Sequence, residues 1–405
     1  MRTGVKPGMM VGMRAGAARF PRAGLLAAMV ALILLLSACG AGAGSGSRAQ
    51  NAVQKIATPM ATAAAPVPSL NWRKISTPID LSHGGVSLGV SPVNGRDAWI
   101  CGPGKAGQFL IWRTQDAGAT WNQISALTPV TPPPTVASSG CNVIADQNLA
   151  TSVAVWYPAT NPSAPGPTSS AVAYYSSDGG MTWRQMGQNW WIDQIATSGA
   201  TTYALVNDLG NQSNINVFAS SDHFATWRSV NPQAQEEAQN PPVLWVSPTS
   251  GNALLRNYLN QIYQSTDGGN QWMSTTGQSN PSTQAQLAVW RGQSAGWLLC
   301  GASASGSSAQ PLCSTDLGKT WAARPAATGA SCSAVGLTGD GSLYAVCLGA
   351  AGAAEPYVLL RLPLNASAWT TVGGAPDKYI TVMQSGQIWL SLGDGSATYV
   401  LDQLP

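Results

Sequence analysis

One octapeptide recurs through the chain, and it constrains the fold more than any other feature of the sequence. Each copy has Ser or Thr at position 1, Asp at position 3 and Trp at position 8. The five copies are Thr114–Trp121, Ser176–Trp183, Ser220–Trp227, Ser265–Trp272 and Ser314–Trp321. Self-similarity at a regular spacing predicts a repeat architecture, in which one supersecondary unit recurs along the sequence.

The residues of the octapeptide suit a tight turn between two antiparallel strands. An Asp carboxylate accepts hydrogen bonds from turn amides, glycine tolerates positive φ, and the Trp ring covers the turn. The five aspartates are Asp116, Asp178, Asp222, Asp267 and Asp316. The five tryptophans are Trp121, Trp183, Trp227, Trp272 and Trp321.

Two further tryptophans extend the repeat beyond these copies. Trp72-Arg-Lys-Ile75 and Trp369-Thr-Thr-Val372 match the residues that follow the octapeptide tryptophans, as in Trp121-Asn-Gln-Ile124. The seven tryptophans are spaced by 49, 62, 44, 45, 49 and 48 residues, which suits four short strands per unit.

The strand patterns at the two ends of the sequence predict how the repeat closes. Three strands follow Trp369, at 379–384, 387–392 and 397–403, and the segment 70–76 supplies a fourth. The sequence therefore predicts an all-β, seven-bladed β-propeller of four-stranded antiparallel blades, closed by the N-terminal strand.

The octapeptide resembles the Asp-box of the sialidase-like, or BNR-repeat, propellers, and the resemblance covers nearly everything after residue 70. Similar seven-bladed propellers include the photosystem II stability and assembly factors, which act as scaffolds. The resemblance implies that the Asp-box turns lie on one face and that ligands enter the opposite face. It also implies a structural role, and no catalytic one, for the five repeat aspartates.

The first 38 residues have the three-part form of an export signal, with a basic segment at 1–22 and an apolar one at 23–36. Leu36-Ser37-Ala38-Cys39 resembles the lipobox of bacterial lipoproteins, which implies a lipidated Cys39 at the mature N-terminus. An ordinary signal peptide cut near Ala38 and an uncleaved anchor are the alternatives. We expect a lipid-anchored protein on the extracytoplasmic side of a bacterial cell membrane.

The segment 39–69 is rich in Gly, Ala and Pro, so we expect a flexible tether that leads to a propeller at 70–405. Charge argues against a nucleic-acid partner. Five of the 20 basic residues lie in the first 22 positions, so 15 basic residues face 17 acidic ones in the remainder. A nearly neutral protein has little field to attract phosphate backbones.

Six cysteines remain beside Cys39, and an even number in an exported protein favours disulfides over metal ligation. Alignment of the blades predicts Cys101–Cys141 and Cys300–Cys332 as equivalent links between blades, which leaves Cys313–Cys347. Pairing within blades, Cys300–Cys313 and Cys332–Cys347, is the alternative. The sequence has no Cys-x-x-Cys, and its only histidines are His83 and His223, so we expect no metal and no cofactor.

Candidate ligand residues lie on the loops that join the fourth strand to the next blade and the second strand to the third. The adjacent indoles at Trp190 and Trp191 suit stacking on a sugar or contact with a protein, although strand alternation favours burial of at least one. The candidate ligand-binding residues are Trp190, Trp191, Asp193, Glu236, Glu237 and Arg256. The other titratable loop residues are Asp80, His83, Glu355, Asp377 and Lys378.

Two functions are compatible with this sequence. The favoured one is a non-catalytic, monomeric binding or assembly module for a protein or glycan. The alternative is a sialidase-like or xyloglucanase-like glycoside hydrolase, which needs two carboxyl groups about 5–10 Å apart. The sialidase arginine cluster has no evident counterpart, because Arg73, Arg184 and Arg228 follow repeat tryptophans on predicted outer strands.

Overall fold

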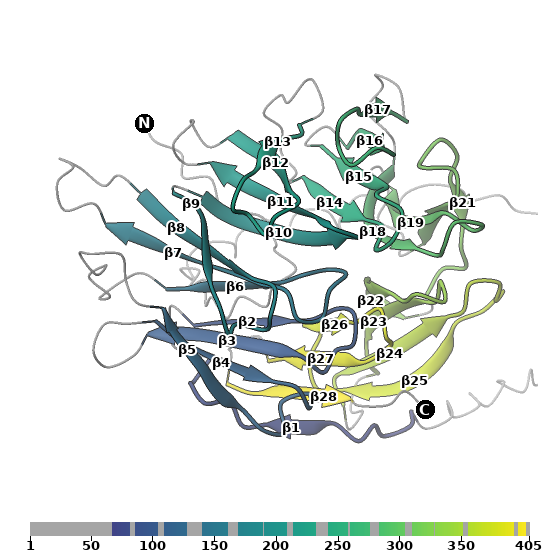
Figure 1. Cartoon of the computed structure of the whole chain (residues 1–405). Coiled ribbons are helices and arrows are strands. Elements are labelled where there is room, and N and C mark those ends of the chain that lie inside the picture. Colours follow the sequence, from purple (N-terminus) through teal and green to yellow (C-terminus); the bar gives the residue numbers. More distant parts are fainter. Residues whose placement is uncertain are drawn as a thin grey trace, which may run out of the picture. The chain divides into compact units, whose positions relative to one another are not determined.

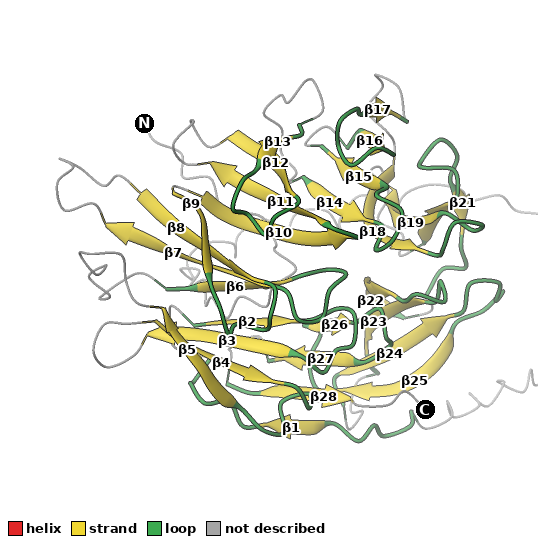
Figure 2. Ribbon diagram, viewed as in Figure 1, coloured by secondary structure: helices red, strands yellow, loops and turns green. Residues whose placement is uncertain are grey.

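The computed structural model describes residues 67–81, 86–103, 109–127, 140–160, 169–188, 190–208, 214–231, 242–257, 260–275, 283–303, 310–327, 329–350, 355–392 and 396–401. These residues form seven antiparallel sheets of four strands each, arranged as the blades of a ring (Figure 1). Every regular element in this part of the protein is a strand (Figure 2). The predicted seven-bladed all-β fold is confirmed.

Six blades are built from consecutive strands. Blade 1 comprises β2 (Ser87–Val90), β3 (Ala98–Pro103), β4 (Phe109–Thr114) and β5 (Asn122–Leu127). Blade 2 comprises β6 (Asn142–Ala145), β7 (Val153–Thr160), β8 (Ser169–Ser176) and β9 (Arg184–Gln188). Blade 3 comprises β10 (Trp190–Ser198), β11 (Thr201–Asp208), β12 (Asn214–Ser220) and β13 (Arg228–Ser229).

The next three blades repeat this order. Blade 4 comprises β14 (Val243–Val246), β15 (Ala253–Arg256), β16 (Ile262–Ser265) and β17 (Met273–Ser274). Blade 5 comprises β18 (Thr283–Trp290), β19 (Trp297–Ser303), β20 (Pro311–Ser314) and β21 (Ala322–Ala323). Blade 6 comprises β22 (Ala330–Leu337), β23 (Leu343–Leu348), β24 (Tyr357–Leu362) and β25 (Thr370–Ala375).

Blade 7 joins the two ends of the propeller. Its first three strands are β26 (Ile380–Val382), β27 (Ile388–Ser391) and β28 (Thr398–Leu401), and its fourth is β1 (Arg73–Ile75). β1 pairs antiparallel with β28, with Lys74 opposite Tyr399. The predicted closure is therefore confirmed, and the pairing removes an open edge from each partner.

The hydrophobic core is divided among the boundaries between blades. Side chains alternate along each strand, so each blade contributes one face to the boundary before it and one to the boundary after it. At the seam, Ile75 and Val400 of blade 7 pack with Leu88 and Ile100 of blade 1. The Trp389 indole of blade 7 also donates a 2.8 Å hydrogen bond to the Gly95 carbonyl of blade 1.

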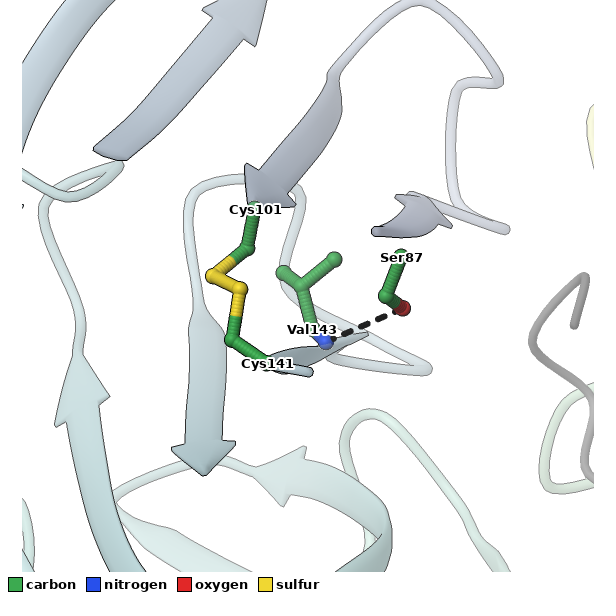
Figure 3. The surroundings of a disulfide bond; sticks show 4 residues. All are labelled: Ser87, Cys101, Cys141 and Val143. Atoms are coloured by element: carbon green, nitrogen blue, oxygen red, sulfur yellow. Dashed lines mark hydrogen bonds between the residues drawn. A yellow bond between two sulfur atoms is a disulfide. The ribbon is translucent and has the colours of Figure 1, made fainter. Parts of the chain in front are cut away.

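The three disulfides confirm one predicted pairing and correct the others. Cys101 of β3 bonds Cys141, which directly precedes β6, so this disulfide links blades 1 and 2 (Figure 3). Beside it the Val143 amide donates to the Ser87 hydroxyl across the same boundary (Figure 3).

The other two disulfides lie within blades. They are Cys300–Cys313 in blade 5 and Cys332–Cys347 in blade 6, so the expected Cys300–Cys332 and Cys313–Cys347 pairings are wrong and the within-blade alternative is right. The reason is strand register. Cys300 and Cys313 lie directly opposite each other on β19 and β20. Cys332 lies inside β22 at a bulge, whereas its supposed counterpart Cys141 precedes its strand.

Candidate functional site

In blades 1 to 5 the octapeptide forms the turn between the third and fourth strands. In blade 1, the Asp116 carboxylate accepts hydrogen bonds from the Thr120 amide at 2.8 Å and from the Thr120 hydroxyl at 2.6 Å. Thr114 closes the turn by accepting a hydrogen bond from the Gly118 amide at 2.8 Å. Burial opposes ionisation of Asp116, but hydrogen bonds from Thr120 and Thr114 outweigh it and lower the pKa of Asp116 to about 2.

Each turn presses against the outer strand of the preceding blade. A Cβ added to Gly118 would lie 2.7 Å from a methyl carbon of Ile75, so only glycine fits against that strand. Gly180 meets Ile124 in the same way at the next boundary. In each case the contacted residue lies three positions after a repeat tryptophan. The octapeptide turn is therefore a joint between blades as well as a link between strands.

The same joint recurs at the following boundaries with different residues. Gly269 packs against Val230 between blades 3 and 4. Between blades 2 and 3, Phe224 takes the glycine position, with a φ of 62°, and shares a core cluster with Met186. The Trp227 indole completes that boundary by donating to the Met186 carbonyl at 3.1 Å.

The boundary between blades 5 and 6 departs from this pattern. The blade 6 turn keeps Trp369 at position 8, but it has Leu362, Leu364 and Ala366 at positions 1, 3 and 5. In each octapeptide turn the residues at positions 4 and 5 both have positive φ. The corresponding residues of blade 6, Asn365 and Ala366, do not have positive φ. The blade 6 turn therefore folds differently, although Leu364 and Ala366 still pack against the core shared with blade 5.

The facing residue of blade 5 differs as well. Arg324 stands three positions after Trp321, where other blades place Ile75, Ile124, Met186, Val230 or Thr275. Its guanidinium donates a 2.9 Å hydrogen bond to the Pro363 carbonyl of blade 6. Burial lowers the pKa of Arg324, because a charged group loses hydration there.

A cavity of about 340 Å³ lies between blades 5 and 6. Its polar lining comes from Arg291, Arg324, Ser314, Thr315, Thr320 and Asn365. Its apolar lining comes from Leu298, Leu343, Leu364, Ala322, Gly341 and the Cys300–Cys313 disulfide. The volume is at the lower end of the range of small-molecule sites. The candidate functional site is this cavity, which we call the 5/6 pocket.

Arg291 enters the 5/6 pocket from the turn that follows the first strand of blade 5. Its amide donates to the Gly296 carbonyl, as the Asp146 amide donates to the Ser152 carbonyl in the matching turn of blade 2. Other blades place Ser91, Ser247, Thr338 and Met383 at this position, and all four are buried. A partly exposed arginine is thus a second departure from the repeat at the same boundary.

The 5/6 pocket is cationic. Its described lining includes two guanidinium groups and no carboxylate. Two carboxylates adjoin lining residues in the sequence, and both are already hydrogen-bonded. Asp316, next to Thr315, accepts from the Thr320 amide and hydroxyl, and Asp340, next to Gly341, accepts from Arg361 at 2.9 Å. Among the described residues, no carboxylate forms a salt bridge with Arg291 or Arg324.

The candidate residues inferred from the sequence do not gather in this pocket. Trp190 is a core residue, 4% exposed, and its ring stacks on Phe218 with centroids 4.5 Å apart, so it has no free face for a ligand. Trp191 is partly buried and stacks on Trp156 at 5.3 Å. Both rings pack within the boundary between blades 2 and 3.

Two other candidates lie on strands. Asp193 is the extra residue of a β-bulge in β10, between Ile192 and Gln194. Arg256 ends β15, is 6% exposed, and has a pKa lowered to about 10 by burial. The candidates Glu236, Glu237 and His83 lie outside the described residues, as do the export signal, Cys39 and the tether up to residue 66.

The remaining loop candidates lie on the face opposite the octapeptide turns. Asp80 is in the β1–β2 connection, Glu355 in the β23–β24 loop, and Asp377 and Lys378 in the β25–β26 connection. Most loops of that face lie outside the described residues, so the expected entry of ligands there stays a prediction. Sequence reasoning missed Arg291 and Arg324. Alignment of the blades would have marked both as departures from the repeat.

Within the described part of the protein, no three His, Cys, Asp or Glu side chains come together as a metal site would require. The same residues contain no helix with the length and apolar character needed to cross a membrane.

Comparison with known proteins identifies the architecture. No protein-family model and no curated protein matches the sequence. A solved structure of YCF48 bound to D1 peptide is similar with a TM-score of 0.50 and 15% identity, over 83% of this protein and 99% of the other. YCF48 from Cyanidioschyzon merolae gives a TM-score of 0.48 and 13% identity, over 81% and 98%.

An ancestral GH74 enzyme gives a TM-score of 0.48 and 12% identity, over 83% of this protein and 48% of the enzyme. At these identities the likeness concerns the fold alone.

Proposed function

We propose that this protein is a lipid-anchored, extracytoplasmic propeller of the Asp-box, or BNR-repeat, type that acts as a non-catalytic binding or assembly module for another protein. The observation that carries the proposal is the 5/6 pocket. It offers two guanidinium groups and an aliphatic wall on a rigid sheet scaffold. Such a site can hold a ligand group by charge and shape without supplying an acid and base pair.

Part of the wall of the 5/6 pocket belongs to regular structure, and Arg291, Arg324 and Leu364 lie on the turns and connections beside it. Cys300 and Cys313 are paired residues of β19 and β20, and their disulfide fixes one wall. Leu298 and Leu343 are buried residues of the boundary core. A preformed site loses little conformational freedom on binding, so more of its contact energy appears as affinity.

Two further observations support parts of the proposal. YCF48, which has a similar fold, is known in a structure with D1 peptide, and we carry peptide binding over to this protein as a hypothesis. The Leu36-Ser37-Ala38-Cys39 segment supports a lipid anchor at the membrane.

The proposal is tested with the full-length protein, lipidated and reconstituted in nanodiscs. The discs are incubated with solubilised envelope proteins from the host and, separately, with a panel of envelope and plant polysaccharides. We expect retention of a specific protein by mass spectrometry, relative to empty discs, and no shortening of any glycan. Cleavage of a polysaccharide would instead establish the glycoside hydrolase alternative.

The anchor is tested in the same host. Cys39→Ser should abolish incorporation of a labelled fatty acid and release the protein from the membrane fraction. The neighbouring Ser37→Ala variant, which keeps the cysteine, should remain lipidated.

A further inference from the structure

Three departures from the repeat converge at the boundary between blades 5 and 6. Arg324 stands where blades 7, 1 and 3 have Ile75, Ile124 and Val230, and Arg291 stands where blades 1, 2, 4 and 6 have a small or acidic residue. Leu364 stands where the other turns have Asp. All three line the 5/6 pocket. In a repeat protein, departures at separate positions that meet in space indicate a local role different from packing.

No described acidic residue pairs with the positive charges of the 5/6 pocket. Arg324 donates to the Pro363 carbonyl, which satisfies one of its five N–H groups. Among the described residues, none forms a hydrogen bond with the Arg291 guanidinium, and a Cβ added to Gly341 would lie 3.4 Å from its Nε. Partly buried cations with remaining donors favour an external anion.

The shape and chemistry of the lining indicate what that anion is attached to. Guanidinium groups bind planar carboxylates through two parallel hydrogen bonds. Beside them, Leu298, Leu343 and Leu364 form an aliphatic wall. The described lining has no aromatic ring on which a sugar could stack. A carboxylate next to an aliphatic side group, as found in acidic peptide segments, satisfies both parts of this surface.

We propose that the 5/6 pocket binds the carboxylate of an acidic segment of a partner protein, with a neighbouring aliphatic residue against the leucine wall. This inference rests on the proposed function and names the group that the pocket recognises. The carboxylate can belong to an Asp or Glu residue or to the C-terminus of the partner. The two sources share the same contacts with Arg291 and Arg324.

The test uses fluorescence anisotropy with the full-length protein in nanodiscs of neutral lipid. One labelled peptide ends in Leu-Asp-Gly amide, so its only carboxylate is that of the aspartate. A second ends in Asn-Leu with a free C-terminus, and a third ends in Leu-Asn-Gly amide and carries no carboxylate. We expect at least one acidic peptide to bind, the third not to bind, and binding to weaken as salt is raised.

Variants assign the binding to the pocket. Arg291→Gln should weaken binding of the acidic peptide by about 10- to 100-fold, because it removes a pair of charge-assisted hydrogen bonds. Lys319→Gln is the matched control, because it removes one positive charge from an exposed position of the blade 5 turn that does not line the pocket. Leu364→Trp should block binding by filling the cavity without changing charge.

Two results would overturn the inference. One is equal peptide binding by the wild type, Arg291→Gln and the Arg291→Gln/Arg324→Gln double variant. The other is that neither acidic peptide binds. Thermal unfolding of each variant confirms that the fold is intact. If peptide binding fails while the nanodiscs still retain a protein, the inference falls and the proposed function stands. If neither peptide nor protein binds, both fall.

Discussion

The boundary between blades 2 and 3 and the boundary between blades 5 and 6 are built from the same repeat, yet one is filled and the other is hollow. At the first, the buried Asp146 carboxylate of blade 2 accepts hydrogen bonds from the Thr197 amide at 3.0 Å and its hydroxyl at 2.6 Å. Arg291 occupies the matching position in blade 5 and lines a cavity. The same position of the repeat therefore holds a joint at one boundary and lines a cavity at another.

The filled boundary reaches beyond its own two blades. Asn148, in the same turn as Asp146, donates to the Thr197 carbonyl of blade 3 at 3.0 Å and to the Val246 carbonyl of blade 4 at 2.8 Å. One turn thus ties three blades together.

The hollow boundary is linked elsewhere. Arg324 donates to the Pro363 carbonyl, and the Trp369 indole donates to the Pro325 carbonyl at 2.8 Å. Both hydrogen bonds lie near the outer strands of blades 5 and 6 rather than at the turn that holds Arg291. The filled boundary has outer-strand contacts of the same kind, since the Trp227 indole donates to the Met186 carbonyl. The two boundaries therefore differ at the inner turn, where Asp146 binds Thr197 and Arg291 makes no such contact with a described residue.

The largest expected effect comes from breaking the filled boundary. Asp146→Ala should lower the free energy of unfolding by about 2–4 kcal/mol, because it leaves partly buried donors of Thr197 and Asn148 without their buried acceptor. Chemical denaturation of the variant measures this. Asp340→Ala is the comparison, since that carboxylate also accepts several hydrogen bonds but is 56% exposed, so water can replace them and its loss should cost less. Equal losses of unfolding free energy in the two variants would show that the hydrogen bonds of Asp146 stabilise the boundary no more than those of an exposed carboxylate do.

A smaller effect is expected at the glycine of the octapeptide turn. Gly118→Ala should cost about 2–3 kcal/mol, because the residue has a φ of 81° and the new methyl group would collide with Ile75. Gly199→Ala is the matched control: its φ is 57°, and nothing lies within 4 Å of the added Cβ. That variant should lose only about 1 kcal/mol of stability, because the added methyl group strains the backbone at this φ and meets no neighbour. A melting-temperature difference between the two variants reports the contact between blades.

The octapeptide aspartates predict a dependence of stability on pH. The pKa values of Asp116, Asp178 and Asp316 are lowered to about 2 from an ordinary value of 3.8, so their contribution is complete above 3.8 and is lost as the pH falls toward 2. We expect the melting temperature to drop across this window. Asp116→Asn should reduce the drop, and an unchanged profile would contradict the assignment.

The smallest effect on stability is expected at the hollow boundary. Arg291→Leu should leave the unfolding free energy unchanged or raise it by about 1 kcal/mol, because a residue kept for binding rather than packing tolerates an apolar replacement. Differential scanning fluorimetry measures the change. A loss as large as that of Asp146→Ala would mean that Arg291 is itself a structural joint.

The sequence was sufficient for the blades but not for the site. The octapeptide predicts its turn from local chemistry, so five blades and their spacing follow directly, and strand patterns at the ends account for closure by β1. Trp190 and Trp191 were harder to assign, because a bulge at Asp193 places their rings within a boundary that periodicity alone does not reveal. The disulfides depended on register, which one bulged residue in β22 changes.

The 5/6 pocket could not be predicted for a different reason. Arg291 and Arg324 are 33 positions apart in the sequence, and each looks like an ordinary surface cation. They meet only because the first turn of blade 5 and the end of its outer strand both face blade 6. A comparison of blades position by position finds the departures, but only the structure shows that they share a cavity.

The seam of blade 7 also has a consequence for the order of events during synthesis of the protein. The Trp72 indole donates to the Gly374 carbonyl, which is 302 residues away, and β1 pairs with the last strand described. The first described strand must therefore wait for the last described strand before the ring can close, and such distant pairing is slow to form. A nascent or truncated protein would present an unpaired β1 edge, so closure itself distinguishes finished molecules from unfinished ones.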